Sequence, residues 1–352
     1  MFAYVGCYTE ADRGGRGLGI GVYRVDDSGT WALVETVAGV GNPSFLALDR
    51  DQGRLYTIHG GNFAAVSAYA RDRQTGRLTL LNTRPSGGRN PVHLDFDAPG
   101  RLLAVANYTA GTVTALPINA DGTLAPPVEV FDQRGDPGPD PVEQASAHPH
   151  HSPFDHDRRF LVVPDKGLDR LFIYRPDAAG GRLVPHDPPS VATHPGAGPR
   201  HIAFHADAPH AYVINELDST VTRYDYDRER GTLHPRQVIG TLPPDFDGKN
   251  TGSEIAIAPS GRFLYASNRG HNSIAIFAID PADGALTAIG WESTRGNTPR
   301  YFGLDPAGAF LYAANQDSDT IVAFRVDPAS GGLAPTGQVI QTGRPSSIVF
   351  AA

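Results

Sequence analysis

The segment His148-Pro149-His150-His151 is the densest run of histidines in the chain. Imidazole gains and loses a proton near neutral pH, so it suits a general base or a general acid. Alternate residues of a strand share a face, so His148 and His150 could instead bind a metal ion together. Solvated loop histidines would give the same letters. We predict that His150 is the general base, with His148 close behind it and His151 on the other side of the strand.

Three arginines and one glutamate lie farther along the chain and could complete a site. Arg200, Arg269 and Arg300 carry guanidinium groups, which bind carboxylate or phosphate through two parallel hydrogen bonds and stabilise a developing oxyanion. Glu216 could orient His150, act as a second base or hold an arginine. A purely structural set of ion pairs, with Glu216 and Glu254 as the acids, is the alternative interpretation.

These residues occupy fixed positions in an internal repeat. Each copy has a proline, two variable residues, an apolar strand, a turn, a second apolar strand and then, in most copies, Asn or Asp. Six copies start at 43, 91, 149, 199, 252 and 299, and each spans the same interval of 16 residues; the copy at 252 has Gly in place of Pro. A seventh copy starts at Pro345 and lacks its second strand, but Phe2–Cys7 supplies a matching strand at the N-terminus.

The repeat predicts an all-β fold, a seven-bladed β-propeller. The spacing of 46 to 58 residues suits a four-stranded blade with its loops. The N-terminal strand completes the blade begun by the C-terminal strand, which closes the ring and removes its free edges. An open β-solenoid would not need such half-copies. Length alone would suggest ~2 or 3 domains, whereas the repeat predicts one domain over residues 1–352.

Antiparallel strands in a blade place the start of the first strand and the end of the second strand on one face, near the axis. This geometry predicts two rings of mostly polar residues around the axis. The position after the repeat proline gives Ser44, Val92, His150, Arg200, Ser253, Arg300 and Ser346. The position after the second strand gives Gly60, Tyr108, Lys166, Glu216, Arg269, Gln316 and Tyr8. Loop residues on a rigid scaffold are the usual place for function.

The composition argues against several classes of protein. A net charge of −8 with only two lysines argues against nucleic-acid binding. No apolar run approaches the ~20 residues of a membrane span, and the N-terminus does not resemble a signal peptide, so we expect a soluble cytoplasmic protein. Cys7 is the only cysteine, which excludes an intrachain disulfide. The sequence has no phosphate-binding glycine motif before a helix, so we expect no nucleotide cofactor.

Two segments carry a resemblance to a known family: Gly196-Ala197-Gly198-Pro199-Arg200-His201 and Val213-Ile214-Asn215-Glu216-Leu217. With them, essentially the whole chain resembles the lactonase family of seven-bladed propellers, which includes bacterial 6-phosphogluconolactonases and fungal 3-carboxy-cis,cis-muconate lactonizing enzymes. The resemblance implies a site without metal or cofactor. Its implied catalytic residues are His150, Arg200, Glu216 and Arg269, and the substrate-binding residues that we predict around them are His148, His201, Arg300, Tyr8 and Lys166.

The resemblance implies hydrolysis of a small anionic lactone, with 6-phosphogluconolactone of the pentose phosphate pathway as the favoured substrate. Cycloisomerisation of a carboxymuconate would use the same arginines. A non-catalytic propeller that presents a face to a protein partner is a further alternative. A calcium-dependent gluconolactonase would need several oxygen ligands at the axis, where the two rings supply one carboxylate, Glu216. The oligomeric state is left open.

Overall fold

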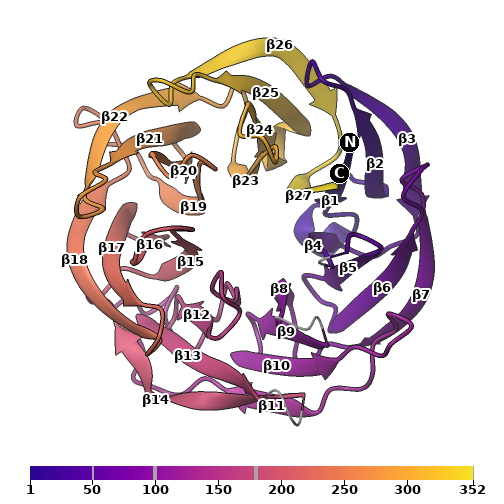
Figure 1. Ribbon diagram of the computed structural model, residues 1–352, viewed down its shortest axis with the longest axis horizontal. Helices are drawn as coiled ribbons and strands as arrows, with labels where there is room; N and C mark the ends of the chain where they lie inside the picture. The colour runs from indigo at the N-terminus through magenta and orange to yellow at the C-terminus, as the bar shows by residue number, and fades with distance from the viewer. Residues whose placement is uncertain (50, 98–100, 178–180, 352) are drawn as a thin grey trace.

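The computed structural model describes residues 1–49, 51–97, 101–177 and 181–351. Its strands form seven antiparallel sheets that stand in a ring around a central axis (Figure 1). We call the sheets blades. This confirms the predicted propeller. The helical segments among the described residues are two short 3-10 turns, Ala11–Arg13 and Gln316–Ser318.

Each blade runs from an inner strand beside the axis to an outer strand at the rim. The first two blades are β4 (Pro43–Leu48), β5 (Arg54–His59), β6 (Ala65–Arg71) and β7 (Leu78–Pro85), then β8 (Pro91–Phe96), β9 (Leu102–Asn107), β10 (Thr112–Pro117) and β11 (Glu129–Asp132). The third blade is β12 (Leu161–Asp165), β13 (Arg170–Asp177) and β14 (Arg182–Ala192). The fourth is β15 (Pro199–Phe204), β16 (His210–Asn215), β17 (Thr220–Asp227) and β18 (Thr232–Gly240).

The remaining blades follow the same order. The fifth is β19 (Thr251–Ile257), β20 (Phe263–Arg269), β21 (Ser273–Ile279) and β22 (Leu286–Ser293), and the sixth is β23 (Pro299–Leu304), β24 (Phe310–Asn315), β25 (Thr320–Val326) and β26 (Leu333–Gln341). The seventh joins both ends of the chain: β27 (Pro345–Ala351) is inner, followed by β1 (Phe2–Cys7), β2 (Gly19–Val25) and β3 (Trp31–Ala38). Phe2 pairs with Ala351 and Val5 with Ile348, so β-pairing closes the ring as predicted.

The 16-residue frame has a direct structural meaning. Its first and last residues are cross-strand partners in every copy, as in Pro199 with Asn215 and Gly252 with Asn268. In three of the four copies that end in Asn, its side-chain amide binds the third strand of its own blade, as Asn215 does by donating to Thr220 and Thr222 at 2.9 Å each. A buried amide that ties the second strand to the third strand accounts for the Asn in these copies.

The third blade departs from the expected four strands. Its innermost segment makes two isolated bridges, Pro149 with Asp165 and Phe154 with Leu161, and no regular strand. The prolines Pro149 and Pro153 have no backbone N–H to donate, so a continuous ladder cannot form. Two bonds still hold the segment to β12, from His150 N to Pro164 O and from Val162 N to Pro153 O.

The apolar core lies between neighbouring blades, whose facing side chains pack together. One cluster holds Tyr212 and Ile214 of the fourth blade against Leu264 and Phe277 of the fifth. Tyrosines of second strands also reach into a glycine turn of the next blade: Tyr4 to Gly76, Tyr56 to Gly122, Tyr212 to Gly284, Tyr265 to Gly331 and Tyr312 to Gly29. The apolar clusters, together with these tyrosines at five of the seven junctions, fix neighbouring blades against each other and so position the inner strands that carry the site.

Candidate active site

A β-bulge at the start of the inner strands directs the candidate side chains toward the axis. In the fourth blade Pro199 pairs with Asn215 and His201 with Ile214, so Arg200 has no partner in the ladder. The same irregularity follows Pro299 and leaves Arg300 unpaired in the sixth blade. A bulge adds one residue to a strand and re-aims its neighbours. Arg200 and His201, though consecutive, therefore both line the same cavity.

Two adjoining cavities lie on the axis. We call the first the upper cavity; its volume is ≈110 Å³ and its lining is Arg13, Asn90, Val92, Tyr108, His150, Glu216, Arg269 and Arg300. The lower cavity, of ≈10 Å³, is lined by Tyr8, Ser44, Phe45, Val92, His150, Arg200, His201, Glu254, Arg300, Tyr301 and Ser346. Val92, His150 and Arg300 line both, so they stand where the two cavities meet.

Glu216 is the anion around which the cations gather. One oxygen accepts a hydrogen bond from Lys166 Nζ at 2.9 Å, and the other lies 3.1 Å from Arg200 Nε and 3.0 Å from Arg269 Nη2. Burial opposes ionisation, but the charges of Arg269, Lys166 and Arg200 outweigh it and hold the pKa of Glu216 well below its usual range. Glu216 is therefore a permanent carboxylate and a poor proton acceptor, which favours the interpretation that it holds the arginines.

His150 has the electrostatic setting of a neutral base. It is buried, and burial together with the charges of Arg200, Arg300, Arg269 and Lys166 lowers its pKa well below the usual value. The imidazole is thus uncharged at neutral pH, with one nitrogen free to accept a proton. Its Nδ1 is buried and has no hydrogen-bond partner among the described residues.

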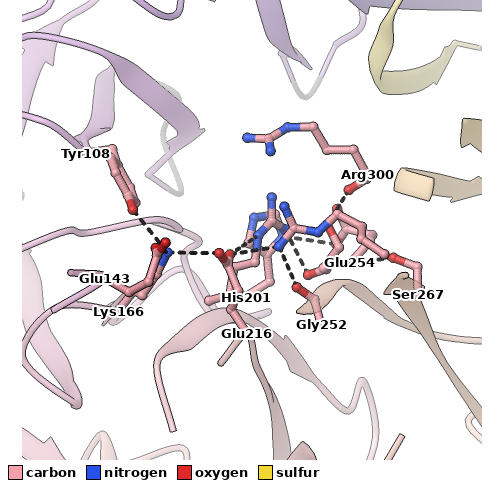
Figure 2. A network of polar contacts seen from close by, with 12 residues as sticks. Tyr108, Glu143, Lys166, His201, Glu216, Gly252, Glu254, Ser267 and Arg300 are labelled. Atoms are coloured by element: carbon pink, nitrogen blue, oxygen red, sulfur yellow. Dashed lines mark hydrogen bonds and ion pairs between the residues drawn. The ribbon is translucent and has the colours of Figure 1, made fainter. Parts of the chain in front are cut away.

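Lys166 and His148 lie just outside the upper cavity, and each contacts a residue that lines it. Lys166 Nζ also binds Glu143 at 2.5 Å and the Tyr108 hydroxyl at 3.2 Å (Figure 2). The His148 ring stacks on Tyr108 with centroids 4.5 Å apart. Neither side chain lines either cavity, and both fix Tyr108, which does. The seven other predicted site residues line the cavities: His150, Arg200, Glu216, Arg269, His201, Arg300 and Tyr8.

A stack of histidines continues below His150. The His201 ring lies 5.2 Å from the His150 ring and 4.1 Å from the His151 ring, and His93 packs against His151 at 4.0 Å. His151 lines neither cavity, unlike its neighbour His150. Its ring stacks on His201, and its Nδ1 accepts from the Ile202 backbone N–H at 3.1 Å.

Sequence reasoning missed Arg13. It lies on the first 3-10 turn, reaches the upper cavity and donates from Nη2 to the Tyr8 hydroxyl at 3.3 Å. The turn is held by Asp12, whose carboxylate accepts from the Asn42 side chain and the Asn62 backbone. No repeat position marks Arg13, since it sits in the loop between β1 and β2; its closeness in sequence to Tyr8 was the available signal.

The cavity is strongly cationic. Five positive side chains line or back it, namely Arg13, Lys166, Arg200, Arg269 and Arg300, and within the described part of the chain two carboxylates, Glu143 and Glu216, form ion pairs with them. Arg13 and Arg300 have no ion-pair partner among the described residues. A cavity lined by an excess of one sign of charge attracts ligands of the opposite sign.

Known proteins resemble this chain over most of its length. A family model described as "Lactonase, 7-bladed beta-propeller" matches residues 2–350. The chain belongs to this family. It is 36% identical to the 6-phosphogluconolactonase of Bacillus subtilis over 304 residues, which cover 85% of this chain and 83% of that protein. It is 34% identical to the 6-phosphogluconolactonase of Formosa agariphila over 308 residues, covering 86% and 85%.

Solved structures of lactonases share the fold closely. The periplasmic gluconolactonase of Pseudomonas aeruginosa superposes with a TM-score of 0.90 at 34% identity, covering 100% of this chain and 99% of that one. Over residues 1–49, 51–97, 101–177 and 181–351, no group of three or more His, Cys, Asp or Glu side chains gathers as a metal site. No described helix is long and apolar enough to cross a membrane.

Proposed function

We propose that this protein hydrolyses the ester bond of a small anionic lactone, with 6-phosphogluconolactone as the substrate. The observation that carries the proposal is the neutral His150 placed beside carboxylate-anchored arginines in a cationic cavity. The 6-phosphogluconolactonases among its relatives support the reaction class. The proposal takes residues 1–352 as one domain, since the site draws its residues from several blades.

His150 starts the reaction by removing a proton from water. The water oxygen bonds to the lactone carbonyl carbon, and the carbonyl oxygen becomes an oxyanion. Arg200 and Arg269, fixed by Glu216, donate to that oxygen. The ring C–O bond then breaks, and the departing alkoxide takes the proton from the His150 imidazolium. The product is the open-chain hydroxy acid, which ionises to a carboxylate.

Arg300, Arg13 and Tyr8 bind the phosphate group. The two arginines flank the Tyr8 ring, with guanidinium carbons 5.7 and 5.0 Å from its centroid. Burial raises the pKa of Tyr8, but Arg300 and Arg13 outweigh it and lower the pKa to about 8. Since Arg200 and Arg269 are already paired with Glu216, the arginines without an acidic partner are the ones available to a dianion. His148 and Lys166 act through Tyr108 and Glu216 and hold the wall against which the sugar lies.

The experiment compares 6-phosphogluconolactone, gluconolactone and 3-carboxy-cis,cis-muconate as substrates of the wild type and of Arg300→Gln and Arg13→Gln. A hydrogen bond to a charged group is worth ~1.5–3 kcal/mol, so each variant should lose about 10- to 150-fold in kcat/KM for the phosphorylated lactone. Turnover of gluconolactone should change less than about threefold. Arg295→Gln, an exposed arginine on an outer turn, is the matched control.

Two other results of this experiment would change the assignment of phosphate binding or of the reaction. Equal turnover of both lactones by the wild type, unaffected by either substitution, contradicts the phosphate assignment. Conversion of the muconate alone would identify a cycloisomerase.

The cytoplasmic location inferred from the N-terminal sequence stays a prediction, and one structural neighbour is described as periplasmic.

A further inference from the structure

A second buried acid–base pair lies directly beneath the proposed base. His201 Nδ1 is 3.0 Å from Glu254 Oε1, and both residues are almost completely buried (Figure 2). Glu254 belongs to neither ring predicted from the repeat, and the mechanism above does not use it. Burying a carboxyl and an imidazole in contact is costly unless the pair has a role or full hydrogen bonding.

An ionised Glu254 fixes the proton on His201. Glu254 Oε1 accepts from the Ile255 backbone N–H at 3.0 Å and lies 3.0 Å from His201 Nδ1. A carboxylate has no hydrogen to donate, so His201 Nδ1 then carries the hydrogen between them, which leaves Nε2 as an acceptor. Nε2 of His201 is buried without a partner among the described residues, as is Oε2 of Glu254. Oε2 is therefore the oxygen that can take or release a proton.

Packing fixes the His201 ring in one orientation. His151 stacks on it with planes inclined by 4°, and His151 Nδ1 itself accepts from the Ile202 N–H at 3.1 Å. Glu254 is anchored in turn, because its backbone N–H donates to Ser267 Oγ at 2.9 Å. These contacts therefore hold both members of the pair in place.

His150 and His201 both line the lower cavity, with ring centroids 5.2 Å apart. When His150 acts as a base through its Nε2, its hydrogen is on Nδ1, and Nδ1 needs an acceptor. His201 Nε2 can be that acceptor. A cavity of ≈10 Å³ is near the minimum that holds one water molecule. Because neither nitrogen has a hydrogen-bond partner among the described residues, one water molecule in this cavity would bridge His150 Nδ1 and His201 Nε2.

We infer that Glu254 is a positioning residue that acts on His150 through His201. The chain Glu254–His201–His150 holds His150 in the tautomer whose Nε2 removes the proton from water, and it supports the imidazolium that forms there. This support matters because the charges that act on the His150 pKa, those of Arg200, Arg300, Arg269 and Lys166, all oppose a positive imidazolium. No atom of Glu254 or His201 bonds to the substrate in this step, and no net proton is lost along the chain. The inference rests on the proposed lactonase function.

The charge of Glu254 makes the inference measurable. Burial raises the pKa of Glu254 to about 8, against the lowering effects of Arg200, the Ile255 N–H and Arg300. The titratable and charged groups that line the cavities with it include His201 and Arg200 on β15, Arg300 and Tyr301 on β23, His150, Tyr8, and His93 across the lower end of the axis. As the pH rises through about 8, Glu254 becomes a carboxylate and supports the imidazolium more strongly, so kcat should rise with it.

The test is the pH dependence of kcat and KM for 6-phosphogluconolactone in the wild type, Glu254→Gln and His201→Gln, corrected for spontaneous hydrolysis. In the wild type we expect kcat to rise through about pH 8. Both variants should lack this rise and lie about 10- to 100-fold below the wild type at its upper end, with KM changed less than about threefold. Tyr8 also titrates near this pH, but it faces the phosphate, so Tyr8→Phe should move KM and leave the rise in kcat.

Glu35→Gln, an ion-paired glutamate on the outer strand β3, is the matched control. Thermal unfolding of each variant confirms that it folds, and the nitrogen-15 shifts of His201 report its tautomer independently of turnover. Glu254→Gln with a wild-type rise in kcat, a loss confined to KM, or a His201 protonated on Nε2 overturns the inference while leaving the lactonase intact. A wild type that hydrolyses no lactone overturns the proposed function and this inference with it.

Discussion

Replacing Glu216 by Gln removes the charge that holds the cationic cluster together. The carboxylate contacts three cations at 2.9 to 3.1 Å, and its side chain is only 11% exposed. Removing one partner of a buried ion pair costs ~3–5 kcal/mol, because the remaining charges stay buried without compensation. For 352 residues at roughly 2 cal/mol/K each, this loss lowers Tm by about 4–7 °C.

Glu143→Gln is the matched control, because Glu143 binds the same lysine but its side chain is 48% exposed. Water screens the half-exposed Glu143 carboxylate, and Lys166 keeps its bond to Glu216, so the loss should be ~0–1 kcal/mol and Tm should change by less than about 2 °C. The assay is thermal unfolding followed by circular dichroism, with lactone turnover measured on the same samples. Turnover of Glu216→Gln should fall by at least about 100-fold, since Arg200 and Arg269 lose their anchor.

The contribution of Glu216 to stability should depend on pH in a defined direction. The pKa of Glu216 is lower in the folded protein than in the unfolded chain, so its stabilisation is present above the unfolded pKa of ~4.3 and is lost as the pH falls below it. The difference in Tm between wild type and Glu216→Gln should therefore be constant from about pH 5 to 8 and shrink at lower pH. A Tm within about 1 °C of the wild type at neutral pH would refute the reasoning.

Three further outcomes follow from the fold. Tyr265→Phe removes the hydrogen bond to Gly331 and should cost ~1 kcal/mol in the free energy of unfolding, measured in urea, with turnover unchanged. The Cys7 thiol is buried and burial raises its pKa to about 11, so it should react with a disulfide reagent only after unfolding; rapid labelling of the native protein would contradict the closed seventh blade. A chelator should leave lactone turnover within about twofold of the untreated enzyme, and abolished activity would instead indicate a metal-dependent site.

Most of the fold could be predicted from the internal repeat. A 16-residue interval between proline and asparagine is the distance between two cross-strand partners, so it marks each blade without any model of the loops. The half-copies at the two ends predicted the closure between β27 and β1. The irregular segment before β12 was not predicted, because the sequence there still matches the 16-residue interval although two nearby prolines interrupt the backbone pairing.

The candidate site was predicted where the repeat fixed a position and missed where it did not. Arg200, Glu216 and Arg269 follow from their register alone. Arg13 comes from a loop, and its approach to Tyr8 depends on how Asp12 holds a 3-10 turn. Glu254 was considered only as the acid of a structural ion pair. Its contact with His201 depends on bulges in β15 and β19, which shift side chains by one place relative to a regular strand.

The central claim is that His150 and Arg200 act on an anionic lactone, and the most direct measurement is the rate of 6-phosphogluconolactone hydrolysis by wild type, His150→Ala and Arg200→Ala. His234→Ala, an exposed histidine on β18, serves as the control. We expect kcat/KM to fall by at least about 100-fold in both site variants and by less than about twofold in the control. Near-wild-type turnover in both folded site variants would contradict the account.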